Sequence, residues 1–501
     1  MLFNSVHFLI FFPIVVLVYF LISKRMKYLW LLAASYYFYM SWNPLYALLI
    51  LTSTVVTWSG GLLISSGERQ TGKRGKRIRK VGGLVGCIVL NLGILFFFKY
   101  YAFTAEMIEN IFALFRISVR IPVFDILLPV GISFYTFQAL GYVIDVFRGE
   151  ITAEKNILRY ALFVSFFPQL VAGPIERSKN LMHQIYEPHT FDADRVKKGL
   201  LLMGWGFFQK LVLADRIALL VTAVYNDYTV YSGLQILLAT VLFAFQIYCD
   251  FGGYSDIAVG AARVMGFTLT KNFKSPYYAV SVSEFWRNWH ISLTTWFRDY
   301  LYIPLGGNRC GRLRKYRNIL LTFTASGLWH GAGLNYIVWG TVNGLYQIAG
   351  DLTRPLRSGL QKKLHIRTEC GSYRLVQRLV TFVFVDFAWL FFRADSLTTA
   401  LRMLRHGAAN LGILSFFDPE TLLGINTMVL TEKNFYVMLL GLVFLMWVDY
   451  RKIQGTDFHA VLARQNIWFR WLVYYGLIFV ILIFGIYGPQ YDASAFIYFQ
   501  F

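Results

Sequence analysis

Charged side chains are scarce in this chain: Asp, Glu, Lys and Arg make up 15% of its 501 residues, whereas 57% are hydrophobic. Soluble domains carry about a quarter charged residues. This composition, with a mean hydropathy of +0.51, therefore excludes an ordinary water-soluble protein. Long apolar runs divided by short basic stretches instead predict an all-α polytopic membrane protein.

Cysteine is also rare. The four cysteines lie far apart and form no CxxC pair, so neither a disulfide framework nor a zinc site is supported; they are Cys87, Cys249, Cys310 and Cys370. EF-hand, Walker and dinucleotide-binding motifs are absent from the sequence. We therefore expect no metal and no bound cofactor.

Acidic residues are outnumbered, 27 against 48 basic ones, which gives a net charge of +21. Nucleic-acid binding is not favoured, because the basic runs are short and are separated by apolar spans. The positive charge is instead typical of cytoplasmic loops. The basic stretch from Gly67 to Lys80 is expected inside, as are Lys24 and Arg25, which places the N-terminus outside.

The apolar runs predict about eleven transmembrane helices plus short or re-entrant pieces, with both termini extracytoplasmic. We expect a single membrane-embedded domain over residues 1–501. Within it, residues 1–150 form N-terminal helices, 151–350 a catalytic core and 351–501 C-terminal helices. The segment 393–434 is expected to lie outside the membrane, with short surface helices.

Two histidines, His290 and His330, lie in long apolar surroundings, and a tryptophan directly precedes each one. An ionisable group inside a membrane is costly, so each is a candidate functional residue. The alternative is that both are structural, with their hydrogen bonds satisfied inside a helix bundle. His183 and His189 lie in a polar stretch and are expected to be solvated.

A continuous helix from Trp286 to Tyr300 would place His290 on one face with Trp286, Leu293 and Phe297. The imidazole would then point into an aromatic wall. Burial disfavours its charged form, and a neutral imidazole is what a general base needs near neutral pH.

The segment from Asn318 to Gly350 lies between two basic loops and must cross the membrane an even number of times. It is too short for two comfortable spans of about 20 residues each. We therefore predict a pair of short or tilted helices that turn near Gly331 and Gly333, with His330 at the bend.

Two acidic residues, Asp250 and Asp256, flank Gly252 and Gly253 in the nearly apolar stretch QIYCDFGGYSDIA. The sequence leaves two interpretations open: the Asp and Gly residues break and cap a helix, or they line a buried polar path.

Acyl transfer suits a base at membrane depth. A thioester is already activated, so an enzyme need only orient an alcohol and remove its proton. A covalent nucleophile is not needed, and Ser326 in ASGLWH does not match the GxSxG pattern. Trp329, Asn335 and glycine-rich backbone are candidates to hold the carbonyl oxygen.

Several long motifs in order, namely FPQLVAGPIER, QIYCDFGGYSDIA, SEFWRNWHISLTTWFRDYLYIPLGG, LWHGA and a terminal FIYFQF, resemble the membrane-bound O-acyltransferase (MBOAT) family. The closest likeness is to its bacterial branch of alginate O-acetyltransferase membrane subunits. The resemblance covers essentially the whole chain.

This resemblance implies a funnel of many helices with a central channel, located in the plasma membrane. It implies that His330 is the catalytic residue and His290 the second active-site residue. The implied donor is acetyl-CoA or an acyl-carrier thioester, and the acceptor is a cell-surface polysaccharide, reached through an extracytoplasmic SGNH-type acetyltransferase or a small relay protein. Further channel-lining candidates are Trp286, Trp289, Trp329, Asn335, Asp250, Tyr254 and Asp256.

A transporter is the alternative class, with the two histidines as a proton relay and Asp250 and Asp256 as coupling sites. Paired halves with matching broken helices are not apparent in the sequence. The motifs above therefore favour the enzyme.

Overall fold

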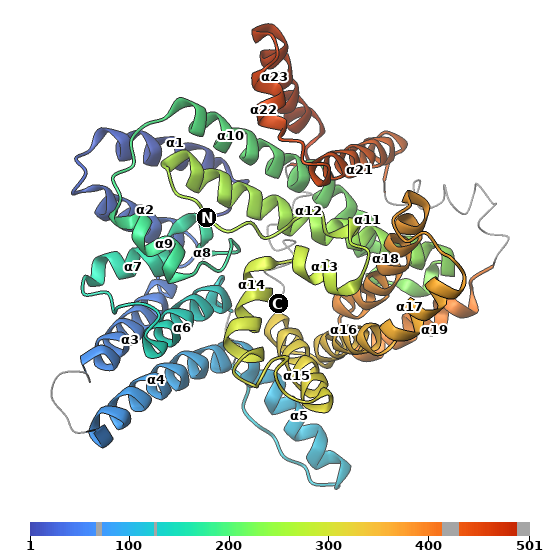
Figure 1. The fold of residues 1–501 in the computed structure, drawn as a ribbon, viewed down its shortest axis with the longest axis horizontal. Helices are drawn as coiled ribbons and strands as arrows, with labels where there is room; N and C mark the ends of the chain where they lie inside the picture. The colour runs from blue at the N-terminus through green and yellow to red at the C-terminus, as the bar shows by residue number, and fades with distance from the viewer. Residues whose placement is uncertain (67–72, 125–127, 413–429, 488–501) are drawn as a thin grey trace. The chain divides into compact units, whose positions relative to one another are not determined.

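The computed structural model describes residues 1–66, 73–124, 128–412 and 430–487. Within these ranges the regular structure is helical throughout, without a strand, which confirms the all-α prediction (Figure 1). Five described helical stretches are long and apolar enough to cross a membrane: Tyr46–Ser66, Arg77–Leu114, Gly233–Met265, Gly371–Arg393 and Ile467–Phe484. The apolar helix Val6–Leu21 is shorter. The total of about eleven spans stays a prediction.

The chain divides into two compact units. The first comprises residues 1–203 with 257–270, and the second comprises 204–256 with 271–501. The division falls within α10 (Ala193–Phe207) and within α12 (Gly233–Met265). Because α12 runs unbroken past Gly252 and Gly253, the helix-breaking interpretation of this stretch is wrong.

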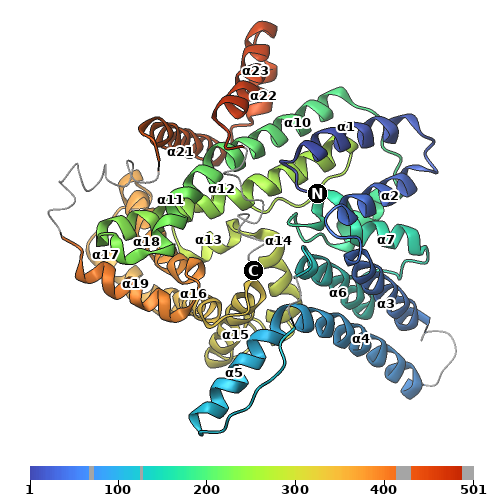
Figure 2. The same cartoon turned by 180° about the vertical axis from the view of Figure 1, so that it is seen from behind.

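Buried hydroxyl and amide groups join the helices of the first unit, where α3, α4 and α6 pack side by side (Figure 2). Tyr160 donates to Thr57 across 2.8 Å, and Ser53 donates to Asn91 across 2.5 Å. Such bonds between helices replace water as the partner of polar groups in a membrane protein. The helices are α1 (Val6–Leu21), α2 (Lys27–Met40), α3 (Tyr46–Ser66), α4 (Lys73–Leu95), the π-helix η1 (Phe96–Tyr100), α5 (Tyr101–Leu114), α6 (Ile132–Arg148), α7 (Ile157–Ser165), α8 (Phe167–Leu170) and α9 (Ser178–Tyr186).

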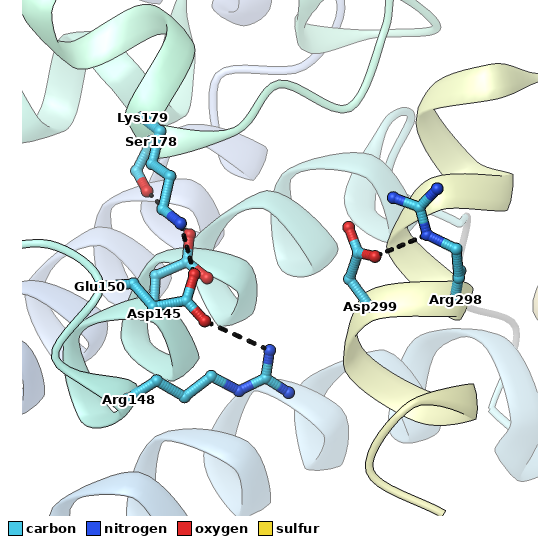
Figure 3. Close-up of polar contacts among 7 residues, drawn as sticks. All are labelled: Asp145, Arg148, Glu150, Ser178, Lys179, Arg298 and Asp299. Atoms are coloured by element: carbon cyan, nitrogen blue, oxygen red, sulfur yellow. Dashed lines mark hydrogen bonds and ion pairs between the residues drawn. The ribbon is translucent and has the colours of Figure 1, made fainter. Parts of the chain in front are cut away.

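Polar contacts fasten the end of α6 to the start of α9 (Figure 3). The Ser178 hydroxyl donates to the buried Asp145 carboxylate across 3.2 Å. Glu150, just past the end of α6, forms ion pairs with Lys179 and, at 3.8 Å, with Arg148. These outer pairs are partly exposed and contribute little to stability. In the second unit, Arg298 pairs with its neighbour Asp299 in the same way, at 2.7 Å.

Aromatic side chains dominate the core of the second unit. Its helices are η2 (Phe208–Ala214, a π-helix), α11 (Asp215–Asn226), η3 (Tyr228–Val230), η4 (Pro276–Tyr278), α13 (Val282–Asn288), α14 (Ile291–Phe297), η5 (Arg298–Tyr302, a π-helix), α15 (Arg312–His330), α16 (Leu334–Leu352), α17 (Arg354–Lys363), α18 (Gly371–Arg393), α19 (Leu397–Ala409), α21 (Glu432–Ile453), α22 (Phe458–Ala463) and α23 (Ile467–Phe484). In the predicted external segment 393–434, residues 413–429 lie outside the described ranges, and α19 precedes them.

The predicted helix pair around His330 is confirmed by α15 and α16, which lie side by side (Figure 1). Both helices extend beyond the predicted bounds, to 19 residues each, and the turn falls between His330 and Leu334. Gly327 and Gly340 meet where the helices cross. A Cβ on Gly340 would lie 2.3 Å from the Phe323 carbonyl oxygen, so only glycine permits this approach.

Replacing Gly340 with Ala is expected to force α15 and α16 apart and to lower the free energy of unfolding by about 1–3 kcal/mol. Gly350 is a matched control on the same helix, because a Cβ there meets no atom within 4 Å. Thermal unfolding of the detergent-purified variants measures the difference. Equal unfolding temperatures for Gly340→Ala and Gly350→Ala would show that the close approach does not limit the packing.

Candidate active site

His330 is the last residue of α15, where the chain turns toward α16. Its side chain is almost completely enclosed, at 4% exposure. The imidazole centroid lies 4.9 Å from that of Trp329, 5.1 Å from that of Trp339 and 5.3 Å from that of Phe392. All three contacts are edge-to-face, which is a favourable aromatic geometry. The residues of α15, α16 and α18 thus form three walls around one imidazole.

His290 is also buried, at 1% exposure, but the predicted continuous helix around it is wrong. α13 ends at Asn288, α14 begins at Ile291, and His290 between them has a left-handed backbone with φ 42° and ψ 54°. A non-glycine residue in this region costs about 1–3 kcal/mol, and such residues gather at functional sites. The helical face predicted from Trp286 to Phe297 therefore does not exist.

A distant segment supplies the hydrogen bonds that support this break. The Ile291 amide donates to the Asn272 carbonyl across 2.9 Å, and the Lys274 amide donates to the Asn288 carbonyl across 3.0 Å. The Ser292 hydroxyl donates to the Asn272 side-chain oxygen across 2.7 Å. Backbone groups that a continuous helix would have satisfied are thereby paired.

Because the helix is interrupted at His290, its ring lies beside the His330 ring, and the two share one aromatic enclosure. The two ring centroids are 6.3 Å apart, and His290 also contacts Trp329 at 6.0 Å and Phe251 of α12 at 4.7 Å. The aromatic surroundings predicted for His290 are therefore present, although the backbone that produces them differs. An imidazole from the break between α13 and α14 thus meets an imidazole and a tryptophan from the end of α15, within the second unit.

Trp286 and Trp289 lie behind the rings that contact His330 and pack against the aromatic side chains there. Trp286 donates from its indole nitrogen to the Asn343 side chain across 3.1 Å and meets Trp339 edge-on at 5.6 Å. Trp289 is only 1% exposed and lies against Trp389, with the ring centroids 5.0 Å apart. Trp286 therefore packs directly on a ring that contacts His330, whereas Trp289 acts one layer further out, through Trp389, which stacks on Trp339.

Asn335 lies in the first turn of α16, near the bend. Its amide nitrogen donates to the Ala394 carbonyl across 2.8 Å and approaches the Phe391 carbonyl at 3.4 Å. These carbonyls belong to the end of α18, where the helix leaves acceptors unsatisfied. Asn335 therefore fastens α16 to α18 and positions the Phe392 wall of the enclosure.

The acidic motif on α12 is held by two partners from η2, Gln209 and Lys210. Asp250 is fully buried and accepts from the Lys210 ammonium at 2.5 Å, while Asp215 pairs with the same ammonium at 2.8 Å. Asp256 accepts from Gln209 across 3.0 Å. Tyr254 is buried on α12 between the two acids. Asp250 thus belongs to an ion-pair cluster, and the next residue, Phe251, touches His290.

Several residues of this region are not predicted from the sequence. Lys210 and Asp215 carry a signal, since both are charged residues inside an apolar stretch. Trp339, Trp389 and Phe392 carry none, because nothing in their local sequence distinguishes them from other core aromatics. Their role follows from the packing of α16 and α18 around His330.

A helical membrane protein that buries two imidazoles in one aromatic enclosure has the features of an intramembrane enzyme. The sequence model of the MBOAT, membrane-bound O-acyltransferase family, matches residues 3–392. The chain belongs to this family and is an acyltransferase.

Similar curated proteins are also named as acyl-transferring enzymes. The chain is 37% identical over 400 residues to the "Probable alginate O-acetylase AlgI" of Pseudomonas syringae pv. tomato, covering 80% of this chain and 73% of the relative. It is 34% identical over 437 residues to the "Peptidoglycan O-acetyltransferase" of Helicobacter pylori, covering 81% and 79%. A "Teichoic acid D-alanyltransferase" of Streptococcus thermophilus is 27% identical over 234 residues, covering 44% and 56%.

Replacing His290 with Gly is expected to give a more stable protein than replacing it with Ala, by about 1 kcal/mol, because both remove the ring but only Gly lacks the Cβ that disfavours a left-handed backbone. Thr295 on α14 is a matched control, where Ala is expected to exceed Gly in stability by about 1 kcal/mol. Unfolding of the four purified variants tests the reversal. The same order at both positions would contradict a left-handed His290.

Proposed function

We propose that this enzyme moves an acetyl group, or another small acyl group, from a cytoplasmic thioester across the membrane toward a hydroxyl acceptor on the outside, for O-acetylation of a cell-surface polysaccharide. The observation that carries the proposal is the meeting of His290 and His330 in one buried aromatic enclosure, with ring centroids 6.3 Å apart. Acetyl-CoA or an acyl-carrier thioester is the proposed donor.

His330 acts as the general base in this proposal. An imidazole nitrogen takes the proton of the acceptor hydroxyl while its oxygen attacks the thioester carbonyl carbon. The carbon–sulfur bond then breaks, the acyl group stays on the oxygen as an ester, and the thiolate takes the proton back from the imidazolium. The products are an ester and a thiol, so a covalent acyl-enzyme is not required.

The spacing of the two rings supports a shared substrate. A hydroxyl oxygen about 2.8 Å from a nitrogen of each imidazole fits rings whose centroids are 6.3 Å apart. Two groups that hold one oxygen fix its direction of attack, and such positioning lowers a reaction barrier substantially. His290 therefore orients the hydroxyl in this proposal, and its left-handed backbone fixes the direction of the ring.

The enclosure also limits water. His330 and His290 are only 4% and 1% exposed. Trp329, Trp339 and Phe392 contact His330, and Trp329 and Phe251 contact His290. A thioester held there is protected from hydrolysis until the acceptor arrives. This protection is what a transferase needs, because water competes with the alcohol for the same activated carbonyl.

The names of the relatives support the class of acceptor. One is named for alginate, another for peptidoglycan and a third for teichoic acid. All three are extracytoplasmic polymers that carry hydroxyl groups. We propose that this chain likewise serves a surface polysaccharide, with an SGNH-type acetyltransferase or a small relay protein receiving the acyl group on the outside.

Replacing His330 with Gln is expected to lower O-acetylation of the surface polymer about 10²–10⁴-fold, the contribution of a positioned general base. O-acetyl content per cell is measured together with the amount of the enzyme in the membrane. His183→Gln is the matched control, because His183 is exposed on α9 and, among the described residues, its ring bonds a backbone carbonyl at 3.0 Å.

Unchanged acetylation by His330→Gln at normal membrane abundance would overturn the assignment of the base. A transporter with a histidine proton relay would give a different outcome. In that case isolated membranes supplied with acetyl-CoA and a soluble hydroxyl acceptor would show no transfer to the acceptor, even with the unaltered protein.

The proposed direction of transfer requires α17 on the cytoplasmic side, and its four cations, Arg354, Arg357, Lys362 and Lys363, support this orientation. In a background without native cysteines, Gly359→Cys is expected to react with a membrane-impermeant maleimide only after the cells are permeabilised. Gly407→Cys on α19 is expected to react in intact cells. Labelling of Gly359→Cys from outside would reverse the proposed orientation.

A further inference from the structure

A small cavity in the first unit lies between the connection of α1 to α2, the helix α7 and the end of α9. Its volume is about 60 Å³. One water-sized sphere occupies about 10–15 Å³ on this measure, so the cavity has room for a group of about four to six non-hydrogen atoms. A tetrahedral phosphate is of this size. None of the residues in the proposed active site lines it.

Three cations line this cavity: Lys24, Lys27 and Arg159. Glu187 is the one acidic residue in the lining, and no carboxylate among the described residues pairs with any of the three cations. The cavity therefore carries a net positive charge. Burial, followed by the repulsion of the nearby Lys24 ammonium, lowers the pKa of Lys27. An anion in the cavity would relieve both effects.

Two of these cations, Arg159 and Lys27, are held in place by aromatic rings and not by counter-charges. The Arg159 guanidinium lies 3.8 Å from the ring centroid of Tyr186 and 5.1 Å from that of Tyr28. A cation over a ring face uses none of its hydrogen-bond donors, so the N–H groups of Arg159 remain for an acceptor. The Arg159 Nε is buried and has no hydrogen-bond partner in the part of the chain that the structure describes.

Lys27 is arranged in a similar way. Its ammonium lies 4.7 Å from the ring centroid of Tyr19 and donates one hydrogen bond, across 2.8 Å, to the His189 carbonyl. An ammonium has three donors, so two remain for a ligand. Planar guanidinium and ammonium groups together are typical of sites that recognise phosphate oxygens.

The position along the chain indicates where this phosphate comes from. The apolar helix α1 ends at Leu21, and Lys24 and Lys27 follow directly. Tyrosines line the cavity, as they do where proteins meet the head-group region of a bilayer. Leu31 and Leu162 add apolar lining beside the cations. A free phosphate has no apolar surface that could contact these leucines, whereas a phospholipid carries acyl chains near its phosphate.

We propose that this cavity binds the phosphate of an anionic phospholipid head group at the membrane surface. The basic residues that follow α1 and the tyrosine-held Arg159 contact the phosphate oxygens, and the apolar side chains contact the start of the acyl chains. Clusters of Lys and Arg next to a membrane helix recognise anionic lipids in this way. The site is independent of acyl transfer.

The experiment measures thermal unfolding of the full-length protein in a neutral detergent. The additives are dihexanoyl phosphatidylglycerol, dihexanoyl phosphatidylcholine and inorganic phosphate, at equal ionic strength. A ligand that binds only the folded state raises the unfolding temperature with its concentration. We expect phosphatidylglycerol to raise it and the other two to have much less effect. We expect Arg159→Gln to weaken the apparent affinity for phosphatidylglycerol about tenfold or more, by loss of charge-assisted hydrogen bonds.

Lys24→Gln is the second variant, because Lys24 is exposed and contributes little to packing, so its loss of affinity is measurable even if Arg159→Gln does not fold. Lys197→Gln, an exposed cation on α10 outside the cavity, is the matched control and should bind like the unaltered protein. Equal stabilisation by phosphatidylcholine would overturn the preference for anionic lipid. Equal stabilisation by inorganic phosphate would assign the cavity to a soluble phosphate, and unchanged binding by both variants would overturn the site itself.

Discussion

The hydrogen bonds between residues 272–274 and the break after α13 are the constraint on which the proposed active site depends. Within a membrane protein, an unpaired amide or carbonyl costs several kcal/mol, because water is not available to replace the lost partner. The chain can leave the helix at Trp289 and His290 only because Asn272 and Lys274 accept or donate the bonds that the helix gives up. In a continuous helix each residue is rotated by about 100° from the one before it, so the His290 imidazole would point in a different direction.

The aromatic enclosure is a consequence of this break together with the bend after α15. His290 is delivered by an interrupted helix and His330 by the end of another, so neither imidazole depends on a flexible loop. Edge-to-face contacts with Trp329, Trp339 and Phe392 hold the His330 ring in one orientation. Similar contacts with Trp329 and Phe251 hold the His290 ring. Such rigid support is what keeps a base aligned with a substrate through repeated turnovers.

The sequence was sufficient for some of these features and insufficient for others. The α15–α16 pair was predictable, because basic loops fix its two ends and Gly331 and Gly333 mark the turn. The break at His290 was not, because the local sequence contains neither proline nor glycine and its hydrogen-bond partners lie in a separate segment. Likewise the sequence shows that Asp250 is an acidic residue in an apolar stretch. Its partner Lys210 lies 40 positions away, and only the fold brings the two together.

The shared ammonium of Lys210 has a consequence for how this family of sequences can change. Asp215 and Asp250 both pair with one ammonium, and all three side chains are buried. Loss of that charge alone would strand two carboxylates together, whereas loss of one acid leaves a balanced pair. Neutral replacement of either acid is therefore better tolerated than neutral replacement of the lysine while both acids are present.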